Sequence, residues 1–254
     1  MAISECPKGR FSPKMARLFK SCCWVLFLTL ILLGVPKLAG IIADSFDYGT
    51  IDPDGAFAWL FVHHLVQAGI FLIGIMVINK FTDLDFGLGW GNRKIGLRCV
   101  LMFALVFSLY VVVIFGVGIL TNSLSPFIYP MEPRNIVGYL SFQLFMSGPS
   151  EELIFRAFAL TMLGLVTKKR IFQGKVSLAN LIAAVIFGLA HVSFSLAPLS
   201  ISFTTSQVIF SIVLGLFYGD CFKKSGSVIY PMIMHSFGNV LMVGFTIVAT
   251  AFMH

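Results

Sequence analysis

The sequence predicts an all-α, polytopic integral membrane protein. Three observations support this fold class: 58% of the residues are hydrophobic, only 11% are charged, and long apolar runs recur along the whole chain. A soluble globular domain carries about 25% charged residues, and a membrane-spanning helix needs about 20 mostly apolar residues. Because spans and short loops use the whole chain, we predict a single membrane domain.

Hydropathy predicts about seven transmembrane helices. Their approximate ranges are 22–42, 57–79, 99–120, 136–166, 178–196, 200–222 and 227–250. Within the single membrane domain we distinguish an N-terminal three-span region, residues 1–135, from a core, residues 136–254. The fourth span is unusually long and contains Gly148-Pro149 near its middle. Proline lacks a backbone N–H, so this dipeptide predicts a bend or a broken helix.

The loops between these spans alternate in charge. The loop 43–56 contains four aspartates and no basic residue. The basic segments are 1–21, 80–98, 167–177 and the pair Lys223-Lys224. Cytoplasmic loops are enriched in Lys and Arg, which predicts a cytoplasmic N-terminus and a C-terminus on the opposite side of the membrane. The net charge of +7 then reflects topology and contact with lipid headgroups, and we expect no nucleic-acid partner.

Three charged residues lie inside the fourth span: Glu151, Glu152 and Arg156. An ionisable side chain at bilayer depth costs several kcal/mol, so such residues usually face a bundle interior or a water-filled cavity and have a function. Glu152 and Arg156 are four residues apart and share a helix face, which predicts an ion pair between them. Glu151 points about 100° away and stays free of that pair.

Two further polar groups lie in later spans, again at helical spacing. Phe187 and His191 are four residues apart in the fifth span, and His235 and Asn239 are four apart in the seventh. Each pair therefore shares a helix face. Depths counted along the spans agree well enough for one intramembrane cavity to collect residues from spans four, five and seven.

The residue types at these positions suit water-activated hydrolysis of an amide. A carboxylate and a neutral imidazole can together hold a water molecule and remove its proton. A second histidine and an asparagine provide hydrogen-bond donors for the oxyanion that develops. The nearby hydroxyls, Ser150 and Ser236, have no clear base and orienting partner, so we expect no covalent nucleophile.

The motifs EExxxR, FxxxH and HxxxN, in this order between residues 136 and 245, resemble the CAAX-protease and bacteriocin-processing family. That family includes the type II CAAX prenyl endopeptidases. The resemblance implies an intramembrane glutamate protease that cleaves a membrane-anchored peptide or a lipidated, prenylated protein. It implies that Glu151 is the general base assisted by His191, and that His235 and Asn239 form the oxyanion hole. The remaining motif residues would support or line the site: Glu152, Arg156 and Phe187.

Other interpretations remain open from the sequence. One glutamate and two histidines also make a zinc ligand set, but the HExxH spacing is absent, so we expect no cofactor. A transporter or a bacteriocin-immunity factor is the non-enzymatic alternative, because transporters also place ionisable residues at the membrane midplane. We expect His63 and His64 of the second span to be interfacial or buried hydrogen-bonding residues, since adjacent residues on a helix face different ways.

Overall fold

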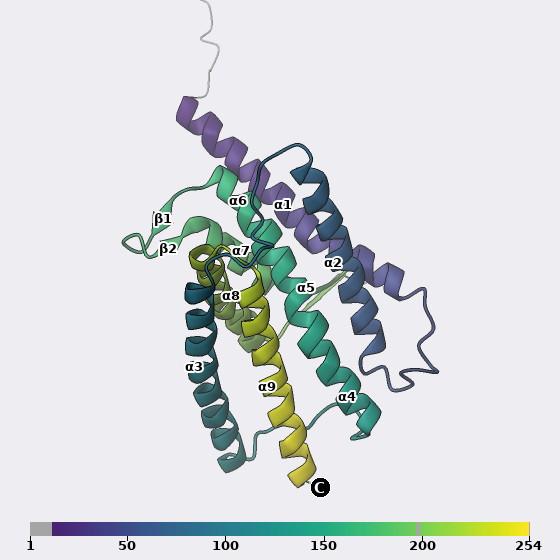
Figure 1. The fold of residues 1–254 in the computed structure, drawn as a ribbon. Helices are drawn as coiled ribbons and strands as arrows, with labels where there is room; N and C mark the ends of the chain where they lie inside the picture. The colour runs from purple at the N-terminus through teal and green to yellow at the C-terminus, as the bar shows by residue number, and fades with distance from the viewer. Residues whose placement is uncertain (1–11, 197–198, 254) are drawn as a thin grey trace, which may run out of the picture.

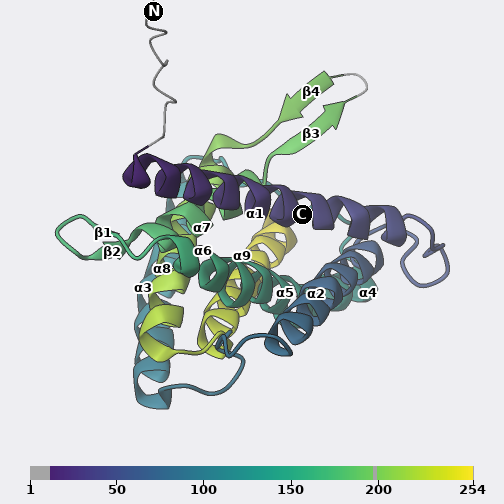
Figure 2. The same ribbon diagram turned by 90° about the horizontal axis from the view of Figure 1, so that it is seen from above.

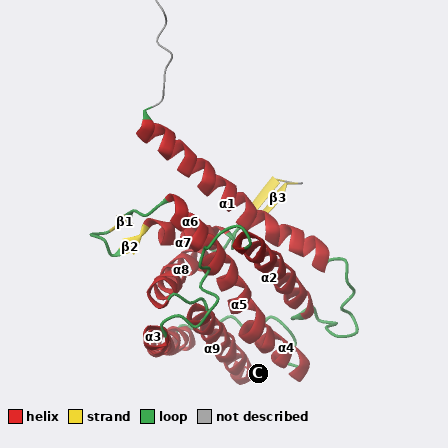
Figure 3. Ribbon diagram, turned by 45° about the horizontal axis from the view of Figure 1, so that its top comes forward, coloured by secondary structure: helices red, strands yellow, loops and turns green. Residues whose placement is uncertain are grey.

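The computed structural model describes residues 12–196 and 199–253 and confirms an all-α membrane fold. Within these residues, five helices are long and apolar enough to cross a bilayer. They are α1 (Pro13–Ala43), α2 (Ala58–Asn79), α3 (Arg93–Leu120), α8 (Thr205–Ser225) and α9 (Ile229–Met253). The strands within the described residues form two short antiparallel hairpins. Helices make up most of the structure (Figure 3).

A composite helix, residues 133–166, runs through the middle of the bundle (Figure 1). α2 lies on one side of it, and α9, α8 and α3 lie on the other (Figure 1). The packing pairs are α1 with α2, α3 with α9, α7 with α8, and the middle of the composite helix with α9. Side chains on the composite helix therefore face both halves of the molecule.

The composite helix is continuous, so the break that the sequence predicts at Gly148-Pro149 is absent. Its parts are α4 (Pro133–Phe142), η1 (Gln143–Ser147), α5 (Gly148–Glu152), η2 (Leu153–Leu160) and α6 (Thr161–Val166), where η marks π-helical turns. In a π turn each carbonyl bonds to the N–H five residues on, so the carbonyl that would face Pro149 can use the following N–H instead. Such π turns occur often at functional sites.

The fifth predicted span is shorter than expected. α7 (Leu178–Leu189) has 12 residues, which is about 18 Å of helix against a hydrocarbon core of about 30 Å. The following residues form the hairpin of β3 (Ser193–Leu196) and β4 (Leu199–Ser202), which projects from the bundle in Figure 2. Serine alternates with apolar residues along both strands, a two-residue period typical of strands that a hydropathy average does not register.

The helices around the site are connected by loops at both ends of the bundle. Asp52 accepts hydrogen bonds from the N–H groups of Ala56, Phe57 and Ala58 at 2.7–2.8 Å and so anchors the start of α2. At the opposite end of the bundle, a second hairpin, β1 (Arg170–Ile171) with β2 (Val176–Ser177), connects α6 to α7.

The largest apolar cluster lies around η2, where every residue is buried. Residues from α1, α2, α6, α7 and α8 also belong to this cluster. The charged side chain of Arg156 is therefore enclosed by protein on all sides, with 1% of the residue exposed. A buried charge of this kind needs a partner close by.

Candidate active site

Glu152 supplies the partner of Arg156, as the helical spacing predicts. Oε2 of Glu152 lies 2.9 Å from Nε of Arg156, and both residues are buried. The guanidinium group also lies over the rings of Phe187 and Tyr218, at 4.6 and 5.4 Å from their centroids. These ring faces surround the parts of the guanidinium group that meet no hydrogen-bond acceptor among the described residues.

His235 lies between the two adjacent glutamates. Its Nδ1 is 2.8 Å from Oε1 of Glu152, and its Nε2 is 3.9 Å from Oε2 of Glu151. The ring of Tyr218 stacks on the imidazole at 5.1 Å between centroids. A carboxylate paired with arginine can only accept, so Nδ1 of His235 carries a hydrogen and donates a hydrogen bond to Glu152. Only Nε2 is then available to Glu151 or to a substrate.

Asn239 lies one turn beyond His235 on the same face of α9. Its Nδ2 donates a hydrogen bond to Oγ of Ser147 at 3.0 Å, which leaves the second amide hydrogen free. The close approach of α5 to α9 depends on Gly148. A Cβ atom at this position would lie 2.8 Å from both the backbone nitrogen and the hydroxyl of Ser236.

His191 lies in the turn after α7 rather than within the helix of the predicted fifth span, which corrects the prediction from sequence. Its Nδ1 donates to the carbonyl of Phe187 at 2.9 Å, and its ring meets that of Phe187 edge to face at 5.0 Å. Phe187 also lies 6.0 Å from the ring of His235. His191 is half-buried at the rim of the site, near Glu151.

The structure adds a residue to this cluster that the motifs do not contain. His64 of α2 is buried, and its Nε2 lies 3.4 Å from Oε1 of Glu151, 87 residues along the chain. Its Nδ1 donates to the carbonyl of Leu60 at 2.9 Å. The sequence signal was present, since a histidine in an apolar span is unusual, but its partner could not be identified without the packing of α2 on α5.

The neighbouring His63 has a separate structural role, as expected for adjacent residues on a helix. Its Nε2 lies 3.0 Å from the carbonyl oxygen of Pro36, and its ring stacks on Trp59 at 4.9 Å. His63 thus joins α2 to α1, while His64 faces the composite helix. The prediction of hydrogen-bonding histidines in the second span is confirmed for both residues.

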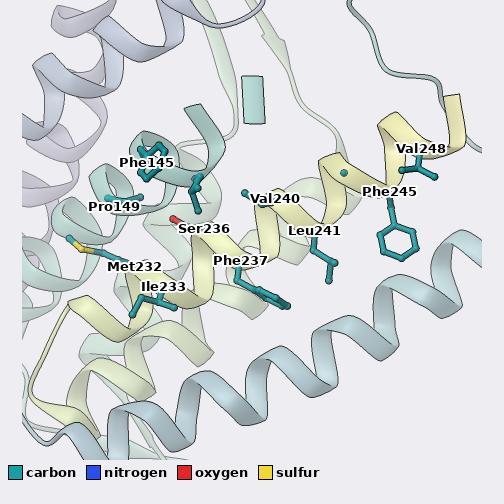
Figure 4. A pocket seen from close by; sticks show the side chains of 12 residues that line it. Phe145, Pro149, Met232, Ile233, Ser236, Phe237, Val240, Leu241, Phe245 and Val248 are labelled. Atoms are coloured by element: carbon teal, nitrogen blue, oxygen red, sulfur yellow. The ribbon is translucent and has the colours of Figure 1, made fainter. Parts of the chain in front are cut away.

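An apolar groove opens beside the cluster, between the composite helix and α9 (Figure 4). Its cavity volume is about 720 Å³. Phe145 and Pro149 form one wall, and Ser236, Val240 and Val248 of α9 are part of the other (Figure 4). The groove presents an almost wholly apolar surface, and Pro149 and Ser236 are the lining residues nearest in sequence to Glu151 and His235, which do not line it themselves.

The part of the chain that the structure describes contains no obvious set of metal ligands. No three His, Cys, Asp or Glu side chains within residues 12–196 and 199–253 come together in a way that could hold a metal ion. Glu151 and the three nearby histidines do not meet this condition as they stand. The expectation of a cofactor-free site stays a prediction, to be tested with chelators.

The fold and the cluster define a polytopic membrane protein with a buried group of carboxylates and imidazoles suited to acid–base chemistry. Residues 133–241 match the family model described as type II CAAX prenyl endopeptidase Rce1-like. The resemblance predicted from the three motifs is thereby confirmed over this segment, which is similar to type II CAAX prenyl endopeptidases. Comparisons with curated proteins and with solved structures give no match. α1, α2 and α3 lie outside the matched segment.

Proposed function

We propose that the protein is an intramembrane endopeptidase that hydrolyses a peptide bond of a membrane-associated substrate with water activated by Glu151 and His191. One observation carries this proposal. Glu151 stays outside the Glu152–Arg156 ion pair, keeps 18% of its side chain exposed, and directs both carboxylate oxygens toward imidazole nitrogens. A carboxylate in this setting is free to take a proton from a bound water molecule.

The chemical steps follow from the directions of the hydrogen bonds. Glu151 removes one proton from water, and the resulting hydroxide attacks the carbonyl carbon of the scissile amide. Nε2 of His235 and the free N–H of Asn239 stabilise the oxyanion of the tetrahedral intermediate. Glu151 then returns the proton to the amide nitrogen, the C–N bond breaks, and an amine and a carboxylic acid leave.

His235 can donate through Nε2 only when its ring carries both protons, because Nδ1 is already committed to Glu152. The Glu152 carboxylate at 2.8 Å holds the ring in place through Nδ1. Arg156 in turn holds Glu152 in place from the other side. The ion pair therefore has a supporting role beneath the oxyanion hole rather than a direct part in bond breaking.

His64 positions Glu151 in this proposal. Its Nδ1–H is used by Leu60, so Nε2 of a neutral ring has no hydrogen to offer the carboxylate. A hydrogen bond across the 3.4 Å between Nε2 and Oε1 requires a hydrogen on one of these two atoms. That hydrogen bond fixes Oε1 and leaves Oε2, on the His235 side, for the water.

The groove beside the cluster suits a substrate with an apolar chain. A prenyl or other lipid group could lie between Phe145 and α9, along the same stretches of helix that carry Glu151 and His235. The partners that we propose are therefore membrane-anchored peptides or lipidated proteins, including prenylated proteins of CAAX type. They would reach the site from the cytoplasmic side or laterally from the bilayer.

The test compares wild type and Glu151→Gln in matched membranes by mass spectrometry of released and membrane-bound peptides. We expect defined fragments with the wild type alone, cut near membrane anchors. Ser150→Ala, next to Glu151 but without a role in the mechanism, is the matched control and should cleave normally. Identical profiles from folded wild type and Glu151→Gln would rule out this chemistry. Loss of wild-type cleavage on adding a chelator would instead favour a zinc-dependent version.

A further inference from the structure

A second cavity lies at the opposite side of α8 from the active site and has a different chemical character. Its volume is about 450 Å³, and it is enclosed by the β1–β2 hairpin, the start of α7 and the last turns of α8. Its charged lining consists of four basic residues and one carboxylate: Arg170, Lys175, Lys223, Lys224 and Asp220. We call this cavity the basic pocket.

Most of the positive charge in the basic pocket is not neutralised by protein. Lys224 pairs with Asp220 at 2.5 Å. Arg170 uses its guanidinium on the backbone carbonyls of Gly174 and Lys175. Within residues 12–196 and 199–253, no carboxylate forms an ion pair with Arg170, Lys175 or Lys223, although Arg170 and Lys223 are close enough for their like charges to interact.

The start of α7 adds to this positive potential. α7 begins at Leu178 beside the pocket, and its N-cap residue Ser177 is part of the lining. The N-terminus of a helix carries a partial positive charge. Unpaired cations and a helix N-terminus around one cavity favour an anion with several acceptor oxygens.

An apolar stripe continues from the pocket along α8. Ile209, Val213 and Phe217 are spaced four residues apart, share one helix face and are 57%, 42% and 60% exposed. Val213 and Phe217 also line the pocket itself. A polar anion site that opens directly onto an exposed apolar face within a membrane-spanning helix matches the two ends of a phospholipid.

We propose that the basic pocket binds the phosphate headgroup of an anionic phospholipid, with an acyl chain along Ile209, Val213 and Phe217. Basic pockets between transmembrane helices at the membrane surface bind such headgroups. The loops at this end of the bundle are the basic ones that the sequence predicts to face the cytoplasm. The proposal does not depend on the peptidase activity.

The test titrates delipidated protein in detergent with phosphatidylglycerol and follows bound lipid by native mass spectrometry. Phosphatidylcholine and inorganic phosphate are titrated in parallel. The test variant is the double substitution Arg170→Gln with Lys223→Gln. The matched control is Lys80→Gln with Lys94→Gln, which removes two exposed charges from the same end of the bundle but outside the pocket.

We expect phosphatidylglycerol to bind at least roughly tenfold more tightly than phosphatidylcholine. A basic residue near an anionic lipid contributes about fivefold in affinity, so the test variant should lose about 25-fold, while the control loses little. Equal losses in both variants, or equal affinity for the two lipids, would overturn the proposal. Inorganic phosphate that binds as tightly as phosphatidylglycerol would identify a free-anion site instead. Circular dichroism verifies that each variant is folded.

Discussion

α2 and α3 are both apolar helices outside the segment that matches the family model, yet they pack against the rest of the protein in different ways. α2 buries His64 and Gln67 on the face that meets the composite helix. α3 buries Phe107, Val111 and Phe115, spaced four residues apart, against α8 and α9. Mean hydropathy over the most apolar window is 2.0 for α2 and 2.8 for α3, so both qualify as spans.

This difference shows that hydropathy alone does not tell whether a transmembrane helix contributes polar residues to the site or only apolar packing. A polar side chain on the buried face of a transmembrane helix requires a partner inside the protein, and for His64 that partner is Glu151. The candidate site therefore extends beyond residues 133–241 to α2. α3 contributes apolar contacts and shape.

The largest effect on stability should come from the ion pair beneath the site, which provides a reference for both helices. Arg156→Met should lower the free energy of unfolding by about 3–5 kcal/mol, because it leaves the buried Glu152 carboxylate without its cation. Thermal or denaturant unfolding in detergent measures the change. The double variant Glu152→Gln with Arg156→Met should recover part of the loss, and a loss below about 1 kcal/mol would contradict a paired, buried charge.

For α2 we expect His64→Gln to reduce kcat by about 100-fold with KM nearly unchanged, since a misplaced catalytic group costs about that much. Glutamine can still donate a hydrogen bond to Glu151 but cannot share a proton as imidazole does. Steady-state kinetics on a cleaved peptide substrate separates kcat from KM. His63→Gln is the matched control and should leave kcat within a few-fold; an equal loss from both variants would assign His64 a purely structural role.

For α3 we expect a loss of stability without a loss of rate. Phe107 stacks on Phe103 at 5.0 Å, so Phe107→Leu should reduce the free energy of unfolding by about 0.5–1.5 kcal/mol. The value of kcat for the folded protein should not change. A tenfold fall in kcat would show that α3, like α2, acts on the site and would remove the contrast between the two helices.

The smallest effect should come from the lipid-facing side of α3. Leu105 is 75% exposed, so Leu105→Ala should change the free energy of unfolding by less than about 0.5 kcal/mol. Unfolding in detergent and kinetics on the same preparation check this expectation. A larger loss of stability would indicate that Leu105 is covered by another protein chain in the membrane.

The helices of this fold were predictable from the sequence only in part. The long apolar runs predicted five helices that the structure contains and the helical segment of the fourth span. The same reasoning extended the helix of α7 too far, to include His191, because a hydropathy average ignores the alternation of serine in β3 and β4. The π turns around Pro149 were also not predictable, since a proline in a helix is compatible with a break, a kink or a wider turn.

The sequence by itself determined the class of protein and two of the contacts or shared faces that lie within one helix. Composition defines a membrane protein, and spacing of four residues defines the Glu152–Arg156 pair and the shared face of His235 and Asn239. Only the tertiary structure decided that His235 lies between the two glutamates and that His64 meets Glu151, across separations of 83 and 87 residues. The reason is physical: helix geometry fixes neighbours three and four residues apart, whereas contacts between helices depend on how their faces pack.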